Sequence, residues 1–231
     1  MASKLLVTLM DPFKCTRCGA CCHFPPPPAP GEEPVQKKIP VYPEEARVLE
    51  QLAEERGVPL RLLEDFVLPD AQNQKILVGR YKILPDERGA CPFYEEEVVE
   101  TDGASDESED ILSRRVLAKC PIHKQRPRAC HTYPIATKRV DAFNREYFID
   151  PDCPVIQAQL DAMKGINPEE IAEIFPEEDK WAKKLDARED EISLLIRQKS
   201  FKGEIEIPHE FTTEEFDAAL RDWEREDLEP L

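Results

Sequence analysis

The stretch "CTRCGACC", residues 15–22, places four cysteines within eight positions, two of them adjacent. In a C-x-x-C pair the intervening residues form a tight turn, so that both sulfurs point at one centre, and Gly19 allows a positive φ close to a metal. Three cysteines at this spacing are typical of iron–sulfur sites, whereas zinc sites more often combine paired C-x-x-C turns from two segments. The stretch therefore predicts a fold that is organised around metal rather than around a large core.

The chain contains eight cysteines, and all of them are predicted metal ligands. Adjacent side chains of an extended segment point to opposite faces, so the doublet is expected to face two centres. Eight thiols would then form two four-thiolate sites; alternatively, one site uses four or five thiols and the others are buried or reactive. Disulfides are the less expected reading, because the chain shows no secretion signal. The predicted ligands are Cys15, Cys18, Cys21, Cys22, Cys91, Cys120, Cys130 and Cys153.

The charge distribution gives the cysteine region a distinct character. The chain has 31 basic and 48 acidic residues, a net charge of −17, which argues against nucleic acid as the main partner. Residues 95–110 hold nine acids and no base, and they are expected to form an exposed loop. Residues 111–147 hold nine Lys or Arg against two acids, a local excess of +7. A four-thiolate centre carries negative charge, so a basic surrounding suits it.

Particular neighbours of the cysteines are expected to support the site. Basic side chains can donate to sulfur or offset its charge, and a proline directly after Cys91, Cys120 and Cys153 fixes the path of the backbone. Three histidines lie within three residues of a cysteine, and we expect hydrogen-bonding neighbours rather than ligands, because the thiols already suffice. The basic residues are Arg17, Lys124, Arg126 and Arg128, and the histidines are His23, His123 and His131.

Hydrophobic periodicity predicts an α+β fold in two parts. Residues 1–165 form a small cysteine-cluster domain with short strands and helices, interrupted by a proline-rich insertion at 23–40 that is expected to be an extended spacer. Residues 166–231 form an α-helical extension, with a helix that begins at Pro168, another through Trp181 and Leu195, and a Thr212–Glu215 capping box before a third. In the first part we expect helices over 42–57 and 59–68 and strands over 75–84 and 145–150.

Three blocks of this sequence resemble the CxxCxxCC cysteine-cluster family of the YkgJ type, whose members are described as zinc- or iron-chelating proteins. The blocks are "CTRCGACC", "CPFY" and "CPIHKQRPRACHTYP", and "DCP" at 152–154 is similar to the last cysteine of the family. The resemblance covers roughly residues 12–155, and it implies a metal-ligand role for the cysteines named above. Flagellin lysine-N-methylases also carry such a block, which raises an enzyme hypothesis.

The function that the sequence favours is metal binding, with one or two 4Fe–4S clusters in a redox or assembly role. The alternatives are a zinc-stabilised interaction module and a protein-modifying enzyme of the methylase type. Catalysis is not expected, because no nucleophile–base pair is visible and no G-x-G-like loop follows a strand. The only early apolar run, "LLVTLM", is too short for a signal peptide or a membrane span. We therefore expect a cytoplasmic protein that binds a protein partner and does not associate with a membrane.

Overall fold

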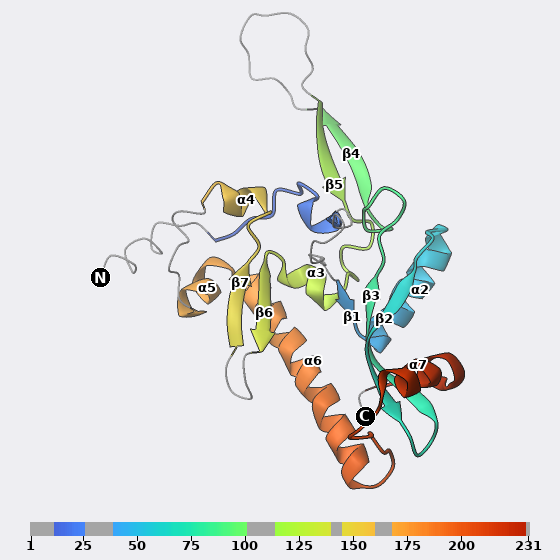
Figure 1. Cartoon of the computed structure of the whole chain (residues 1–231). Helices are drawn as coiled ribbons and strands as arrows, with labels where there is room; N and C mark the ends of the chain where they lie inside the picture. The colour runs from blue at the N-terminus through green and yellow to red at the C-terminus, as the bar shows by residue number, and fades with distance from the viewer. Residues whose placement is uncertain (1–11, 26–38, 101–113, 140–144, 160–167, 230–231) are drawn as a thin grey trace, which may run out of the picture.

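The structure is a computed structural model that describes residues 12–25, 39–100, 114–139, 145–159 and 168–229. Over these ranges the fold is α+β, as the sequence predicts, with helices and short strands around small sheets (Figure 1). None of the helices in these ranges is long and apolar enough to cross a membrane. The expectations for most of the proline-rich insertion and for acidic residues 101–110 concern positions outside the described residues.

A four-stranded sheet has β3, Lys75–Ile83, at its centre. Strand β2, Leu62–Asp70, pairs with it antiparallel along one edge. The other edge of β3 is shared by β1, Pro40–Val41, which pairs with its last residues, and by β8, Glu224–Asp227, which pairs with its first residues. Strand β8 runs parallel to β3 and comes from the C-terminal end of the chain, so the two predicted parts share this sheet.

The prediction of a helix over 59–68 was wrong, because these residues enter β2. The signal that decides the strand is the turn that follows it. The buried Asp70 carboxylate accepts the Gln72 amide at 3.2 Å and the Asn73 side-chain amide at 2.6 Å, and Gln74 has a φ of 53°. An Asx turn of this kind closes a hairpin, and β2 then pairs with the strand predicted at 75–84.

Two further ribbons extend from the body. Strands β4, Glu95–Glu100, and β5, Arg114–Lys119, form an antiparallel ribbon that projects away from the main sheet (Figure 1). Residues 95–100 were expected in a loop and are instead a strand, which lies opposite a basic one, with an ion pair between Glu95 and Lys119. Strands β6, Ile135–Arg139, and β7, Arg145–Ile149, form the second ribbon, and β7 was predicted.

The other four predicted helices are present, and three shorter helical segments accompany them in the described residues. The 42–57 prediction corresponds to a helix that begins at a proline and ends at Gly57 in the left-handed conformation. The Thr212–Glu215 capping box also forms, with Glu215 N–H donating to the Thr212 hydroxyl at 3.2 Å. The helices are η1 Ala20–Cys22, α2 Pro43–Arg56, α3 Arg128–Thr132, α4 Pro154–Gln157, α5 Pro168–Ile174, α6 Pro176–Phe201 and α7 Thr213–Asp222.

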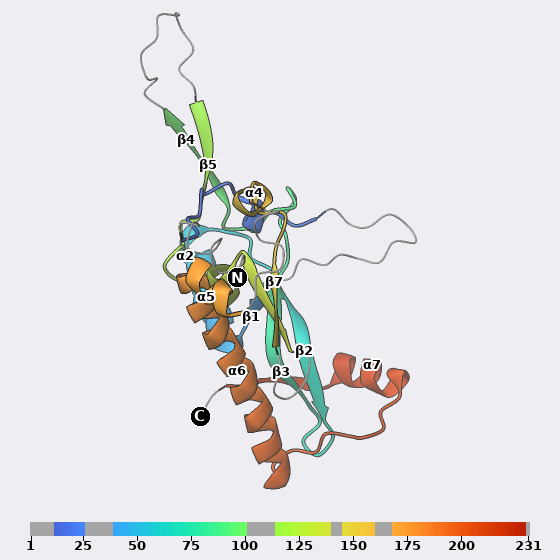
Figure 2. The ribbon, with the colours of Figure 1, turned by 90° about the vertical axis from the view of Figure 1, so that its left-hand side faces the viewer.

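The long helix α6 packs along one face of the main sheet, as the two ribbon views show (Figures 1 and 2). Leu77 of β3 packs with Ile192 and Leu195 of α6, whereas its neighbours Ile76 and Val78 pack with α7. Alternate residues of a strand point to opposite faces, so the C-terminal helices cover both faces of β3 at this level. The division into domains at residue 165 stays a prediction, but the C-terminal extension is packed against the rest of the chain.

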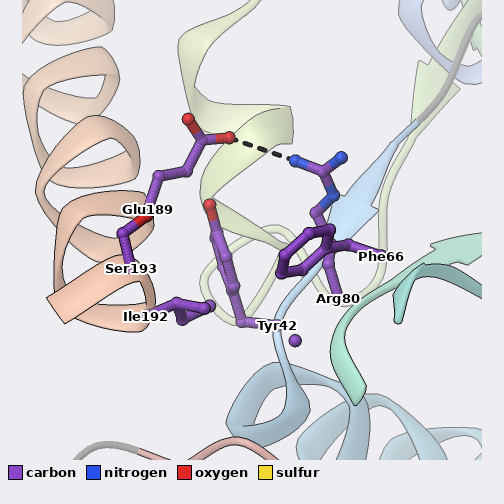
Figure 3. A pocket seen from close by; sticks show the side chains of 7 residues that line it. Tyr42, Phe66, Arg80, Glu189, Ile192 and Ser193 are labelled. Carbon is purple, nitrogen blue, oxygen red and sulfur yellow. Dashed lines mark hydrogen bonds and ion pairs between the residues drawn. The ribbon is translucent and has the colours of Figure 1, made fainter. Parts of the chain in front are cut away.

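A pocket of about 200 Å³ lies between the sheet and α6 (Figure 3). Its polar wall is Arg80, which binds Glu189 at 3.1 Å and Asp65 at 2.9 Å. Its apolar wall includes the Phe66 ring, for which Gly79 makes room: a Cβ at Gly79 would lie 2.5 Å from the ring. No cysteine lines this pocket, so it belongs to the packing of α6 on the sheet rather than to the cysteine region.

Candidate metal centre

The N-terminal cysteines lie on a segment that crosses the molecule between two packed regions. At its start the Phe13 N–H donates to the Ile174 carbonyl at 2.8 Å, and the Phe13 ring lies 5.4 Å from that of Phe175. Further on, Arg17 pairs with Ala118 of β5, accepting its N–H at 2.8 Å and donating its Nε to its carbonyl at 3.0 Å. The segment therefore runs from α5 and α6 to the base of the β4–β5 ribbon.

The doublet does not adopt the extended conformation assumed from sequence. Gly19 has a φ of 84°, and Cys22 N–H donates to its carbonyl at 2.8 Å, which closes the 3₁₀ turn η1. A Cβ at Gly19 would lie 3.1 Å from the Tyr94 ring, so glycine serves both the backbone angle and the close approach. In this turn the sulfurs of Cys21 and Cys22 lie 3.8 Å apart. The expectation that they face opposite ways was wrong, because it required a strand-like backbone.

Five of the cysteines converge beside the core that α2 covers, and we call them the five-thiol group. The Cys91 N–H donates to the Cys22 carbonyl at 2.7 Å, which fixes the loop after β3 against the doublet. Three of the thiols pack against a core that includes Phe93 and Ile122. The group brings together the η1 turn, two loops and helix α3, and its members are Cys21, Cys22, Cys91, Cys120 and Cys130.

The thiols of this group are close enough to affect one another's pKa. Its Cys21 neighbour raises the pKa of Cys22, first through the hydrogen bond between the two sulfurs, and burial raises it further. Burial raises the pKa of Cys91 to about 11, and the charges of Cys120 and Cys21 add to this. Burial also raises the pKa of Cys130 strongly, with contributions from Cys91, Cys21 and Cys120. A cation among these sulfurs would relieve both the burial cost and the repulsion.

The remaining cysteines, Cys15, Cys18 and Cys153, form a second set that we call the three-thiol group. Cys153 is 3% exposed and packs in a core cluster that Phe13 joins, which brings the N-terminal segment to it. Burial raises the pKa of Cys153, and the charges of Cys18 and Cys15 contribute. Both of these partners are exposed. The ribbon views agree that the segment from residue 12 passes beside α4, which begins directly after Cys153 (Figures 1 and 2).

The two groups adjoin at Tyr133. Burial raises the pKa of this phenol, and the charges of Asp150, Cys153, Cys21 and Cys18 raise it further. Tyr133 is therefore near one member of the five-thiol group and two of the three-thiol group. The turn that Tyr133 forms with Pro134 after α3 brings it there.

In both groups backbone amides donate hydrogen bonds to cysteine sulfurs. A proline directly follows three of these cysteines, and this explains which amides are the donors. Proline has no N–H, so the nearest donor after the cysteine is the amide two residues on, and an N–H bond to sulfur favours the thiolate. These bonds lower the pKa of Cys91, Cys120 and Cys153 and so partly oppose the effect of burial. The donors are Phe93 to Cys91, Ile122 to Cys120, Val155 and Ile156 to Cys153 and, without a proline, Arg17 to Cys15 at 3.4 Å.

The basic residues are placed differently from one another. Arg126 is near the five-thiol group, where its charge lowers the pKa of Cys120 and Cys130 against the larger effect of burial. The guanidinium groups of Arg17 and Arg128 bind the carboxylates of Glu97 at 2.7 Å and Glu44 at 2.9 Å. For Arg17, Arg128 and Lys124 the expected role at sulfur stays a prediction.

The histidines have aromatic or hydrogen-bonding partners. The His23 ring lies 4.8 Å from that of Tyr94. The His131 ring stacks on Trp181 of α6 with centroids 4.1 Å apart, and its Nδ1 accepts Arg126 Nε at 3.2 Å. Burial lowers the pKa of His131 to about 4, and the charges of Arg126, His123 and Lys184 contribute, so the imidazole is neutral at pH 7. The stack with Trp181 joins residues 50 positions apart, and no sequence signal could have paired them.

The chemistry of these donors fits a thiophilic metal. None of the eight cysteines forms a disulfide, and soft thiolate sets of this kind bind zinc and iron–sulfur clusters. Within the described ranges, no group of three or more His, Cys, Asp or Glu residues could hold a metal ion with the side chains as they stand. Metal binding would therefore require the thiols of a group to turn toward one another.

The comparison with protein families agrees with this donor set. The model of the CxxCxxCC family, "Putative zinc- or iron-chelating domain", matches residues 14–154. The chain belongs to this family. The match includes all eight cysteines and ends directly after Cys153, so α5, α6, α7 and β8 lie beyond it. No curated protein and no solved structure matches the chain.

Proposed function

We propose that this protein binds a metal cofactor through its cysteine thiolates, with the five-thiol group as its main centre. The observation that carries the proposal is the convergence of five cysteine thiols from four separate segments beside one core. Buried cysteines can also serve as small apolar residues, but that role does not require a pair of sulfurs 3.8 Å apart or amides that donate to sulfur. The family's zinc- or iron-chelating description supports the same conclusion.

We further propose that the cofactor is an iron–sulfur cluster of the 4Fe–4S type, in an electron-transfer or assembly role. The thiol-only donor set and the C-x-x-C-x-x-C spacing support this choice. Such a cluster would supply reversible one-electron chemistry, and the protein's own part would be to bury it and donate amides to its thiolates. Zinc is the alternative, and it would make the centre a structural support for an interaction module.

The test is the metal content of the full chain purified without oxygen. Iron and sulfide near four per chain, with a broad band near ~400 nm that bleaches on reduction, would support one 4Fe–4S cluster. Zinc without colour would support the structural alternative and overturn the redox role. A chain without bound metal after anaerobic purification and reconstitution with iron and sulfide, or with zinc, would overturn the proposal as a whole.

We propose the three-thiol group as a second, more exposed centre, so that all eight cysteines are ligands. The approach of Cys15 and Cys18 to the buried Cys153, next to an anchored Phe13, supports this. Alkylation followed by mass spectrometry tests it, because bound metal should protect the exposed Cys15 and Cys18. Rapid alkylation of both in fully loaded protein, at the rate of the metal-free chain, would restrict the ligands to the five-thiol group.

We also propose a cytoplasmic location and a protein partner. Eight cysteines that form no disulfide suit a reducing compartment, and the net charge of −17 disfavours nucleic acid. The β4–β5 ribbon presents an exposed Val98, 58% accessible, among its charged residues, and this offers an apolar contact for a protein. Detection of the chain in a secreted fraction would contradict the proposed location.

A further inference from the structure

Helix α3 carries Cys130 and is too short to be stable alone. It spans five residues, Arg128–Thr132, whereas isolated helices need roughly a dozen residues to persist in water. Its conformation must therefore come from the segments that contact it. Two such contacts lie on either side of Cys130, at Arg128 and at His131.

The first contact is an ion-pair network that reaches α6. The Glu45 carboxylate accepts the Arg128 N–H at 2.8 Å and the Tyr42 N–H at 3.0 Å, so one side chain caps both α3 and α2. The neighbouring Glu44 carboxylate binds Arg128 Nη1 at 2.9 Å, and it also accepts Arg188 Nε at 2.9 Å and Nη2 at 3.1 Å. Glu44 thereby connects α3 to α6 through a bidentate ion pair with Arg188.

The geometry around Arg188 makes this contact specific. The side chain is 4% exposed, and its Nη2 also donates to the Leu228 carbonyl at 3.2 Å. Both guanidinium groups lie over the Tyr42 ring, with the ring centroid 5.3 Å from the guanidinium of Arg188 and 5.8 Å from that of Arg128. An exposed ion pair would contribute little to the stability of the fold. Removal of one partner of a buried pair destabilises the fold strongly, because it leaves the other charge buried and uncompensated.

The second contact is the stack of His131 on Trp181. The two rings are nearly parallel, 14° apart, and Lys184 Nζ lies 4.0 Å from the centroid of the Trp181 ring. Trp181 and Arg188 are seven residues apart in α6, which is two helical turns, so both lie on the same face of that helix. From one face, the helix therefore reaches α3 on both sides of Cys130, directly at His131 and through Glu44 at Arg128.

We infer that Trp181 and Arg188 are positioning residues for Cys130, so that α6 determines how tightly the cysteine site retains its metal. This inference rests on the proposed metal-binding function. Both residues lie beyond the part of the chain that matches the family model, which ends at residue 154. The C-terminal extension is therefore a working part of the metal site in this protein. Outer contacts that orient ligands typically change metal affinity by about 10–100-fold when they are removed.

The experiment compares metal release from the full, metal-loaded chain and its variants at 25 °C without oxygen. An excess of pyridylazoresorcinol reports the release of zinc or iron(II) from each. We expect Arg188→Met and Trp181→Ala each to release metal about 10-fold faster than the unaltered chain. Trp181→Phe retains an aromatic partner for His131 and should restore a rate close to that of the unaltered chain, an effect that general loosening of α6 would not produce.

Matched controls come from the exposed part of the same helix. Arg197→Met makes the same chemical change as Arg188→Met, and Phe201→Ala truncates an aromatic side chain that is 94% exposed. Both controls should stay within about 2-fold of the unaltered chain, since surface substitutions rarely exceed 0.5 kcal/mol. If Arg188→Met does not fold, the comparison of Trp181→Ala with Trp181→Phe decides the question, because Trp181 is only partly buried.

The outcomes separate the inference from the proposed function. Folded Trp181→Ala protein that releases metal at the rate of the Phe201→Ala control would overturn the inference and leave metal binding intact. Equal acceleration by Trp181→Ala and Trp181→Phe would also overturn it. An unaltered chain that binds no metal would overturn both together.

Discussion

The five-thiol and three-thiol groups are built in different ways from the same kind of residue. The first gathers half-buried thiols from four segments, and it depends on α2, the main sheet and α3 being in place. The second combines two exposed thiols of one C-x-x-C turn with the buried Cys153. A group assembled from distant segments gains metal affinity only when the whole domain folds, whereas a local turn can bind metal with less of the fold formed.

Removal of metal should produce the largest effect and should separate the groups. A ligand present at about 1,000 times its Kd stabilises by ~4 kcal/mol, and each kcal/mol is worth about 2–4 °C in a chain of this size, so chelation should lower Tm by roughly 8–16 °C. Cys130→Ser should reproduce most of this loss and Cys15→Ser a smaller part, in thermal melts paired with metal analysis. Equal Tm values for the two variants would remove the distinction between the groups.

The next effect concerns Gly19, which lies between Cys18 of one group and Cys21 of the other. Gly19→Ala should cost about 1–2 kcal/mol for the left-handed backbone, and the new Cβ would press on Tyr94 and on Ala118, 3.2 Å away. Gly203→Ala is the control, because its φ is 68° and nothing lies within 4 Å of the added Cβ. Both should lose stability in urea, but only Gly19→Ala should lose metal from both groups. Normal metal content in Gly19→Ala would show that metal binding by the two groups does not depend on the backbone conformation at Gly19.

The smallest effect should appear in alkaline solution, in the metal-free chain. The pKa of Cys91 is raised from 9.0 to about 11, mainly by burial. Between these values the unfolded thiol has lost its proton while the folded one keeps it, so stability should fall as pH rises from 9 to 11. Cys91→Ser should make this decline shallower in urea titrations at pH 8, 9, 10 and 11. An unchanged slope would mean that the Cys91 thiol is not buried in the metal-free protein.

Local signals predicted much of the fold because they do not depend on distant partners. Pro43 and Gly57 bound α2, and the Thr212–Glu215 capping box begins α7, where the sequence placed them. The family and the α+β class were also correct. The prediction of a helix over 59–68 was wrong because it rested on spacing alone. The turn at Asp70, which follows these residues, makes them a strand that pairs with β3.

The candidate site was predictable in its residue types but not in its grouping. The cysteines and the prolines that follow them identify the donors in the sequence. The proximity of Cys153 to Cys15 and Cys18, however, depends on where Phe13 packs. The prediction that Cys21 and Cys22 face opposite ways was wrong because a 3₁₀ turn, rather than a strand, sets the direction of their sulfurs. The roles of Glu44, Trp181 and Arg188 were not predicted, because they follow from contacts between residues 50–144 positions apart, which one sequence cannot reveal.

The parallel pairing of β8 with β3 also has a consequence for how the protein is made. Residues 224–227 complete the sheet beside residues 75–78, which leave the ribosome almost 150 residues earlier. At about 5–20 residues per second, that edge of β3 waits roughly 8–30 s for its partner during synthesis. An unpaired strand edge beside apolar Ile76 and Leu77 is a template for association with other nascent chains. The sheet can close only after residues 224–227 have been synthesised, so this edge of β3 stays open to other chains until then.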